Sequence, residues 1–89
     1  MGKEILYFGS ETCGPCRKLH PVIKDIAETE GVKYREYILQ SHKDCFDKYK
    51  ITGLPTVIIE EDGKELKRFL GLHKVGEYLE ALDSNYDYS

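Results

Sequence analysis

The residues with the clearest chemical potential are Cys13 and Cys16, which are separated by Gly14 and Pro15. The apolar residues that follow recur at helical spacing, so this motif lies at the expected start of a helix. Thiols at positions i and i+3 of a first helical turn lie close enough for a disulfide of ordinary geometry. Pro15 has a φ suited to that turn, and Gly14 lacks a Cβ, so another chain can approach Cys13 closely.

The same placement predicts different properties for the two sulfurs. Cys13 should face solvent among free backbone N–H groups at the positive end of the helix dipole, which favours its thiolate, as does nearby Arg17 or Lys18. Cys16, one turn further in, should be more buried and remain a thiol until it is needed. Two-step thiol–disulfide exchange requires this asymmetry, because one sulfur attacks and the other resolves the mixed disulfide.

Zinc binding is an alternative chemistry for the cysteines. Cys13 and Cys16 could combine with His42 and Cys45 into a four-ligand site, and the chain would then be a non-catalytic binding module. Such a site would join a helix start to a helix on the opposite face of the predicted sheet, through the sheet itself. We therefore favour a redox pair without a metal, and we interpret Cys45 as a half-buried helix residue.

Apolar periodicity and turn residues divide the chain into seven expected elements. Strands are predicted over 4–9, 32–39, 56–60 and 64–70, and helices from Cys13 to Gly31, over 41–49, and around 75–82. Ser41 is the expected N-cap of the middle helix. In the last strand, Leu66 and either Phe69 or Leu70 should face inward.

The order βαβ-α-ββα predicts an α/β fold. The right-handed crossover rule makes the first two strands parallel neighbours, and the turn at Asp62-Gly63 makes the last two antiparallel. A four-stranded mixed sheet with three helices on its two faces satisfies these constraints. The Cys13 turn then lies at the carboxyl end of the first strand, where α/β sheets commonly place their chemistry.

Composition indicates an ordinary globular protein. The 89 residues are 40% hydrophobic and 33% charged with a net charge of −3, which predicts a single domain over residues 1–89, with a frayed tail at 83–89. We expect this domain to be a monomer. No basic cluster suggests nucleic acid, and no apolar run approaches the roughly 20 residues of a membrane span. The N-terminus does not resemble a signal peptide, so we expect a cytoplasmic protein.

The sequence resembles the thioredoxin family. Cys13-Gly14-Pro15-Cys16 is joined in this by Arg17, Pro21, the segment 49–56, Asp62-Gly63 and Gly71. The resemblance implies a thioredoxin-like fold and a thiol–disulfide oxidoreductase that reduces protein disulfides, with Cys13 as nucleophile and Cys16 as resolving thiol. It also implies an active-site loop of Thr12, Gly14 and Pro15, and a client-binding groove formed by Leu54, Pro55 and Gly71 with a cis Leu54–Pro55 bond. No bound cofactor would be needed beyond the Cys13–Cys16 disulfide, because a flavoprotein reductase would supply electrons.

The chain also departs from the family pattern. It lacks the N-terminal strand and helix of full-length thioredoxins, a length more like that of glutaredoxins, so reduction by glutathione and a role as dedicated reductant of ribonucleotide reductase remain alternatives. Thr12 replaces the usual tryptophan, and Tyr7, expected in the core, replaces a buried aspartate near the resolving cysteine. His20, at i+4 from Cys16, could relay the proton in place of that carboxylate.

Overall fold

The structure is a computed structural model and describes residues 2–82; the predicted fraying of 83–89 concerns residues outside this part. It confirms the expected order of elements. The strands are β1 (Lys3–Gly9), β2 (Lys33–Ile38), β3 (Thr56–Glu61) and β4 (Lys64–Leu70), and the helices are α1 (Gly14–Glu30), α2 (Lys43–Lys48) and α3 (Val75–Leu82). No helix within residues 2–82 is long and apolar enough to cross a membrane.

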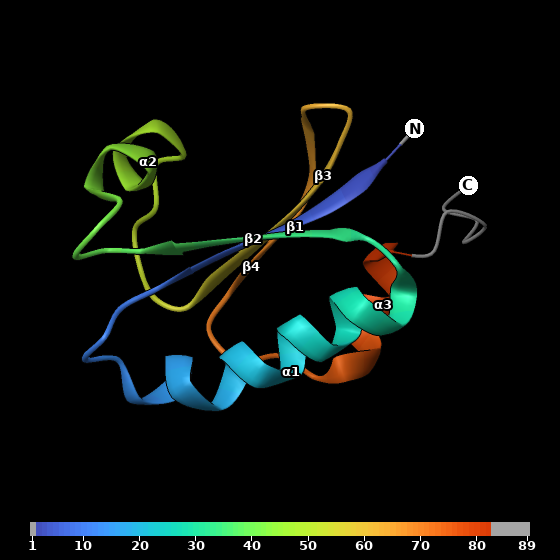
Figure 1. Cartoon of the computed structure of the whole chain (residues 1–89), viewed down its shortest axis with the longest axis horizontal. Helices are drawn as coiled ribbons and strands as arrows, with labels where there is room; N and C mark the ends of the chain where they lie inside the picture. Colours follow the sequence, from blue (N-terminus) through green and yellow to red (C-terminus); the bar gives the residue numbers. More distant parts are fainter. Residues whose placement is uncertain (1, 83–89) are drawn as a thin grey trace.

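The four strands form one mixed sheet in the order β2-β1-β3-β4 (Figure 1). Strand β1 is parallel to β2 and β3 is antiparallel to β4, as the sequence predicts, and β1 is antiparallel to β3. The carboxyl end of β1 therefore leads directly into the turn before α1. Cys13 is the last residue of this turn, and Cys16 lies in the first turn of the helix.

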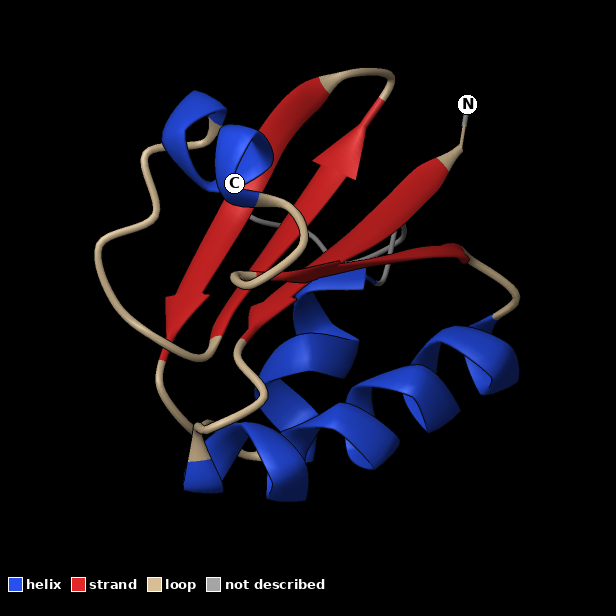
Figure 2. Cartoon of the chain, turned by 60° about the vertical axis from the view of Figure 1, so that its left-hand side comes forward, coloured by secondary structure: helices blue, strands red, loops and turns tan. Residues whose placement is uncertain are grey.

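The helices lie on both faces of the sheet. Figures 1 and 2 show α1 and α3 together on one face and α2 on the other. Residues of β1 alternate between the two cores: Ile5 and Tyr7 pack in the cluster with α1 and α3, and Leu6 and Phe8 pack with Phe46 of α2. All four β1 side chains are at most 2% exposed, which explains why this strand is apolar on both faces.

Helix α1 has clear signals at both ends. Cys13 is its N-cap, and Gly31 ends it in the left-handed conformation with φ 67°. That conformation is accessible to glycine without steric cost, and the Gly31 N–H donates to the carbonyl oxygens of Ala27 and Glu28. The helix continues through Pro21, and its buried face packs the Cys16 end of the helix onto the sheet.

The predicted N-cap of the middle helix is wrong. Helix α2 begins at Lys43 with His42 as N-cap, and no side chain caps its first turn. The backbone N–H groups of Ser41 and His42 both donate to the carbonyl oxygen of Ile38, and the His42 Nδ1 accepts from the Ile38 N–H. This local turn occupies the residues before α2, so Ser41 lies outside the capping position.

One expectation for β4 is also wrong. Phe69 faces inward and is 3% exposed, as one of the predicted alternatives, but Leu66 is 47% exposed. The register explains this difference: Ile59 pairs with Lys67 and Glu60 pairs with Glu65, so Leu66 is an extra residue at a bulge. A bulge breaks the alternation on which the prediction depended, and it lies here on an edge strand, where bulges are common.

Candidate active site

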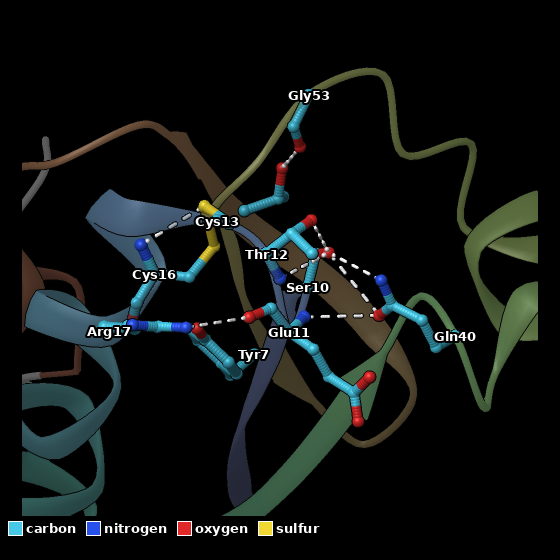
Figure 3. The surroundings of a disulfide bond; sticks show 10 residues. Tyr7, Ser10, Glu11, Thr12, Cys13, Cys16, Arg17, Gln40 and Gly53 are labelled. Atoms are coloured by element: carbon cyan, nitrogen blue, oxygen red, sulfur yellow. Dashed lines mark hydrogen bonds between the residues drawn. A yellow bond between two sulfur atoms is a disulfide. The ribbon is translucent and has the colours of Figure 1, made fainter.

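The structure joins Cys13 and Cys16 by a disulfide at the start of α1, with their Cα atoms 5.2 Å apart (Figure 3). The two sulfurs differ in exposure in the way that the spacing predicts. Cys13 is partly exposed and its loop neighbours Thr12, Gly14 and Pro15 are exposed, whereas Cys16 is only 2% exposed. A partner molecule can therefore reach Cys13 but not Cys16.

Cys13 lies in an environment that stabilises negative charge. Its Sγ accepts a hydrogen bond from the Cys16 backbone N–H at 3.2 Å, at the end of α1 where the helix dipole is positive. The charge from Arg17 is less direct than expected, because its guanidinium donates to the carbonyl oxygen of Glu11 at 3.4 Å. The N-terminus of α1 is thus the main feature of the fold that stabilises negative charge on the Cys13 sulfur.

Gln40, which sequence reasoning missed, holds the loop before Cys13. Its Oε1 accepts from the Glu11 N–H at 3.2 Å and its Nε2 donates to the Ser10 Oγ at 3.0 Å (Figure 3). The Ser10 Oγ in turn accepts from the Thr12 N–H and lies 3.2 Å from the Thr12 Oγ1. A side chain from the segment between β2 and α2 therefore fixes the active-site loop. The contact joins residues far apart in the sequence, so no local sequence motif predicts it.

The Tyr7 side chain of β1 contacts the backbone of Cys16. The Tyr7 hydroxyl donates to the Cys16 carbonyl oxygen at 3.1 Å, and the side chain is 2% exposed, which confirms its expected core position. Burial, with a smaller contribution from the negative charge of Glu36, raises the pKa of Tyr7 to about 12. The phenol therefore stays protonated at neutral pH and cannot accept a proton there.

His20 lies on the same face of the sheet and pairs with a residue that sequence reasoning missed. Its Nε2 is 2.7 Å from the Glu36 Oε1, and its ring centroid is 5.4 Å from that of Tyr7. A cleft of about 280 Å³ is lined by Cys16, His20, Glu36 and Tyr7 among others. The parallel register that places Glu36 directly beside Tyr7 is the signal that could have identified this carboxylate.

The residues predicted to form the groove lie close to one another. The Leu54–Pro55 bond is cis, as the resemblance implies, and the Pro55 side chain is fully buried. Gly71 adopts φ 82°, and its N–H donates to the Pro55 carbonyl oxygen at 2.8 Å. Leu54 is partly buried against both cores, and Cys13 packs against one of these two clusters.

The alternative zinc site is not formed. Cys45 lies in α2 on the opposite face of the sheet from α1, and the His42 Nδ1 accepts from a backbone N–H. Within residues 2–82, no group of three or more His, Cys, Asp or Glu side chains is placed to hold a metal ion. Cys45 is partly buried against the α2 core, as expected for a helix residue of this kind.

Known proteins resemble this chain over most of its length. The family model for thioredoxin matches residues 2–84. A thioredoxin from Chlamydia caviae is 35% identical over 72 residues, which cover 80% of this chain and 71% of the relative. A thioredoxin from Mycoplasma pneumoniae is 36% identical over 70 residues, or 78% of this chain and 69% of the relative.

Solved structures give the same result for the fold. The Fasciola hepatica thioredoxin superposes with a TM-score of 0.82 at 26% identity, covering 91% of this chain and 79% of that one. Thioredoxin 1 from Thermosipho africanus superposes with a TM-score of 0.83 at 24% identity, covering 89% of each chain, and this second likeness supports the fold alone.

Proposed function

The chain belongs to the thioredoxin family and is a thiol–disulfide oxidoreductase that acts as a protein-disulfide reductase, and on that premise we propose a role for each residue of its site. The unequal exposure of the two cysteines is the observation that carries the proposal. Cys13 is the nucleophile because a client can reach it, and because the Cys16 N–H and the helix dipole stabilise its thiolate. Cys16 is the resolving thiol because it is buried beside Cys13.

The reaction proceeds in two exchanges of sulfur. The Cys13 thiolate attacks one sulfur of the client disulfide, a Cys13–client bond forms, and the other client sulfur leaves as a thiolate. Cys16, as a thiolate, then attacks the Cys13 sulfur, the Cys13–client bond breaks, and the second client thiolate leaves. The client gains two electrons and two protons, and the Cys13–Cys16 disulfide present in the structure is the oxidised product.

We propose that the client segment lies across the exposed loop and the segment around Pro55. Gly71 is fixed beside Pro55 by a backbone hydrogen bond, and the large apolar side chains on either side of it, Leu70 and Leu72, are 57% and 53% exposed. Exposed apolar surface of this kind favours contact with an extended peptide. Leu54 offers its backbone to that peptide, and Thr12, Gly14 and Pro15 complete the contact on the other side of the disulfide.

We also propose the electron source, the compartment and the oligomeric state. The redox-active disulfide needs no bound cofactor, and electrons come from a separate flavoprotein reductase. A reductant must itself be kept reduced, which favours the cytoplasm as its compartment. We propose that the chain acts there as a monomer on disulfide-containing proteins, without contact to nucleic acid or membrane.

Reduction of a model disulfide protein tests the proposal and identifies the electron donor. The wild-type chain should turn over with NADPH and a flavoprotein thioredoxin reductase, and reduced glutathione in a parallel reaction should support slower turnover. Cys13→Ser should abolish the reaction, and Cys16→Ser should accumulate a mixed disulfide that mass spectrometry detects. Cys45→Ser is the matched control and should retain wild-type turnover. A Cys13→Ser variant that still reduces the client would refute the assigned roles.

A further inference from the structure

The resolving step requires a proton acceptor next to a buried sulfur. Cys16 is 2% exposed, and only its thiolate can attack the mixed disulfide. Solvent has limited access to this sulfur, so a side chain that exchanges protons near neutral pH has to accept the proton. The cleft that Cys16 lines is where such a group should lie.

The cleft offers few candidates for this acceptor. The titratable or charged groups around His20 are Tyr7 from β1, Tyr34 and Glu36 from β2, and Glu11 and Arg17 along the cleft. Burial raises the pKa values of Tyr7 and Tyr34, so both phenols stay neutral. Arg17 is always protonated, and exposed carboxylates are weak bases at neutral pH. Imidazole is the side chain suited to proton exchange in this range.

We propose that His20, oriented by Glu36, accepts the proton of Cys16 during resolution of the mixed disulfide. The Glu36 carboxylate accepts the His20 Nε2–H at 2.7 Å, which leaves Nδ1 as the acceptor nitrogen. A histidine that a carboxylate orients is a common device for activating a weak nucleophile. Glu36 is a positioning residue in this scheme, and so is Tyr7, which holds the Cys16 backbone through its carbonyl oxygen.

The proton and electron balance of the step is simple. The Cys16 proton moves to His20 Nδ1 across the cleft, the Cys16 thiolate attacks the Cys13 sulfur, and the client thiolate leaves. The departing thiolate takes up a proton from the imidazolium or from water, which returns His20 to its neutral form. The inference rests on the proposed roles of Cys13 and Cys16 and adds to them the base that the second exchange uses.

An aromatic disulfide that releases a coloured thiolate separates the two exchanges. In single-turnover mixing with reduced protein, the first release reports attack by Cys13 and the second reports resolution by Cys16. Every protein carries Cys45→Ser, so that only the active pair contributes to the signal. A thiol of ordinary pKa is about 3% thiolate at pH 7, so a base that completes deprotonation accelerates the second phase by up to about 30-fold.

His20→Gln should therefore slow the second phase by about tenfold or more at pH 7 and leave the first phase within about twofold. The difference should vanish near pH 9 and above, where hydroxide ionises the thiol. Glu36→Gln should slow the second phase less, and the double variant should be no slower than His20→Gln, because residues that act as a unit are non-additive. His73→Gln removes a second histidine–carboxylate pair, with Glu77 at 3.1 Å, and should leave both phases unchanged.

Two results would overturn the assignment of His20. One is a second phase that keeps its wild-type rate from pH 6 to pH 9 in His20→Gln. The other is slowing by the same factor at every pH, which would indicate a structural role for the histidine. If the wild-type chain released only one thiolate per protein, the proposed roles of Cys13 and Cys16 would fail instead.

Discussion

Replacing Tyr7 with phenylalanine should make the protein less stable at neutral pH and less sensitive to alkali. The variant loses the hydroxyl that donates to the Cys16 carbonyl oxygen at 3.1 Å, while a phenylalanine ring fills the same buried space. One hydrogen bond of this kind contributes about 1 kcal/mol to the free energy of unfolding. We expect that loss at pH 8, where the phenol of the wild-type protein is neutral in both the folded and the unfolded states.

Alkaline pH should remove this difference. Burial raises the pKa of Tyr7 from 10.0 in the unfolded chain to about 12 in the folded protein. Between these values the unfolded state releases a proton that the folded state retains, so the stability of the wild-type protein falls as pH rises from 10 towards 12. Tyr7 alone accounts for a loss of about 1 kcal/mol by pH 11, and Tyr7→Phe cannot show this loss. The two unfolding free energies should therefore converge near pH 11.

Guanidinium unfolding of the oxidised proteins, followed by circular dichroism between pH 8 and pH 11, measures both effects. Burial is also the largest cause that raises the pKa values of Tyr34 and Tyr78, and because both proteins contain these groups, most of their effect cancels in the comparison. Ile59→Val is the matched control, because it removes one methyl group from a fully buried side chain and costs about 1 kcal/mol without removing a titrating group. Its curve should run parallel to that of the wild-type protein. If the Tyr7→Phe curve also stays parallel up to pH 11, the reasoning on Tyr7 is refuted.

Three further outcomes follow from the site and its supports. Cys13 should be alkylated well before the other two cysteines in the reduced protein at neutral pH, as measured by mass spectrometry of the labelled peptides, and equal rates would contradict its role as nucleophile. Gly9→Ala should lower the unfolding free energy by about 1–3 kcal/mol, because a Cβ there would lie 2.7 Å from the Tyr7 Cζ. Gly76→Ala, in an open helical position, should instead raise it by about 0.5–1 kcal/mol, and thermal melts that rank the two alanine variants the other way would argue against this packing. Gln40→Ala should slow attack by Cys13, measured as the first phase of aromatic disulfide reduction. The substitution removes the acceptor of the Glu11 N–H and so releases the active-site loop. An unchanged first phase would show that the loop keeps its conformation without Gln40.

Local physics explains which parts of the molecule could be predicted. The start of α1 is determined by neighbouring residues, since the Cys13 cap, Pro15 and the apolar spacing all act within a few positions. The exposure of Cys13 and the burial of Cys16 follow from the same turn. The bulge at Leu66 depends on how β4 pairs with β3, and the shift of the α2 cap to His42 depends on an irregular turn after β2. Apolar alternation alone could locate neither feature.

The position of Glu36 beside His20 depends on the register of β1 and β2, which sequence patterns specify only in part. Tyr7 and Glu36 are direct partners in the parallel pair of β1 and β2, so both side chains face α1 and can meet His20. A slip of one residue would turn Glu36 to the α2 face and place Arg35 or Tyr37 under His20 instead. An arginine there could not accept the His20 Nε2–H as the Glu36 carboxylate does.

Burial on both faces of the sheet selects the observed register. On the α1 face, Tyr34 packs against the cluster that contains Ile5 and Tyr7, and on the α2 face the Tyr37 ring stacks on Phe8 with centroids 4.9 Å apart. A slipped β2 would lose both contacts, and aromatic pairs of this kind contribute about 0.5–1.5 kcal/mol beyond the area that they bury. The residues that place a carboxylate beside His20 are therefore apolar and aromatic ones that exchange no proton or electron in the reaction, because their packing fixes which β2 side chain lies under α1.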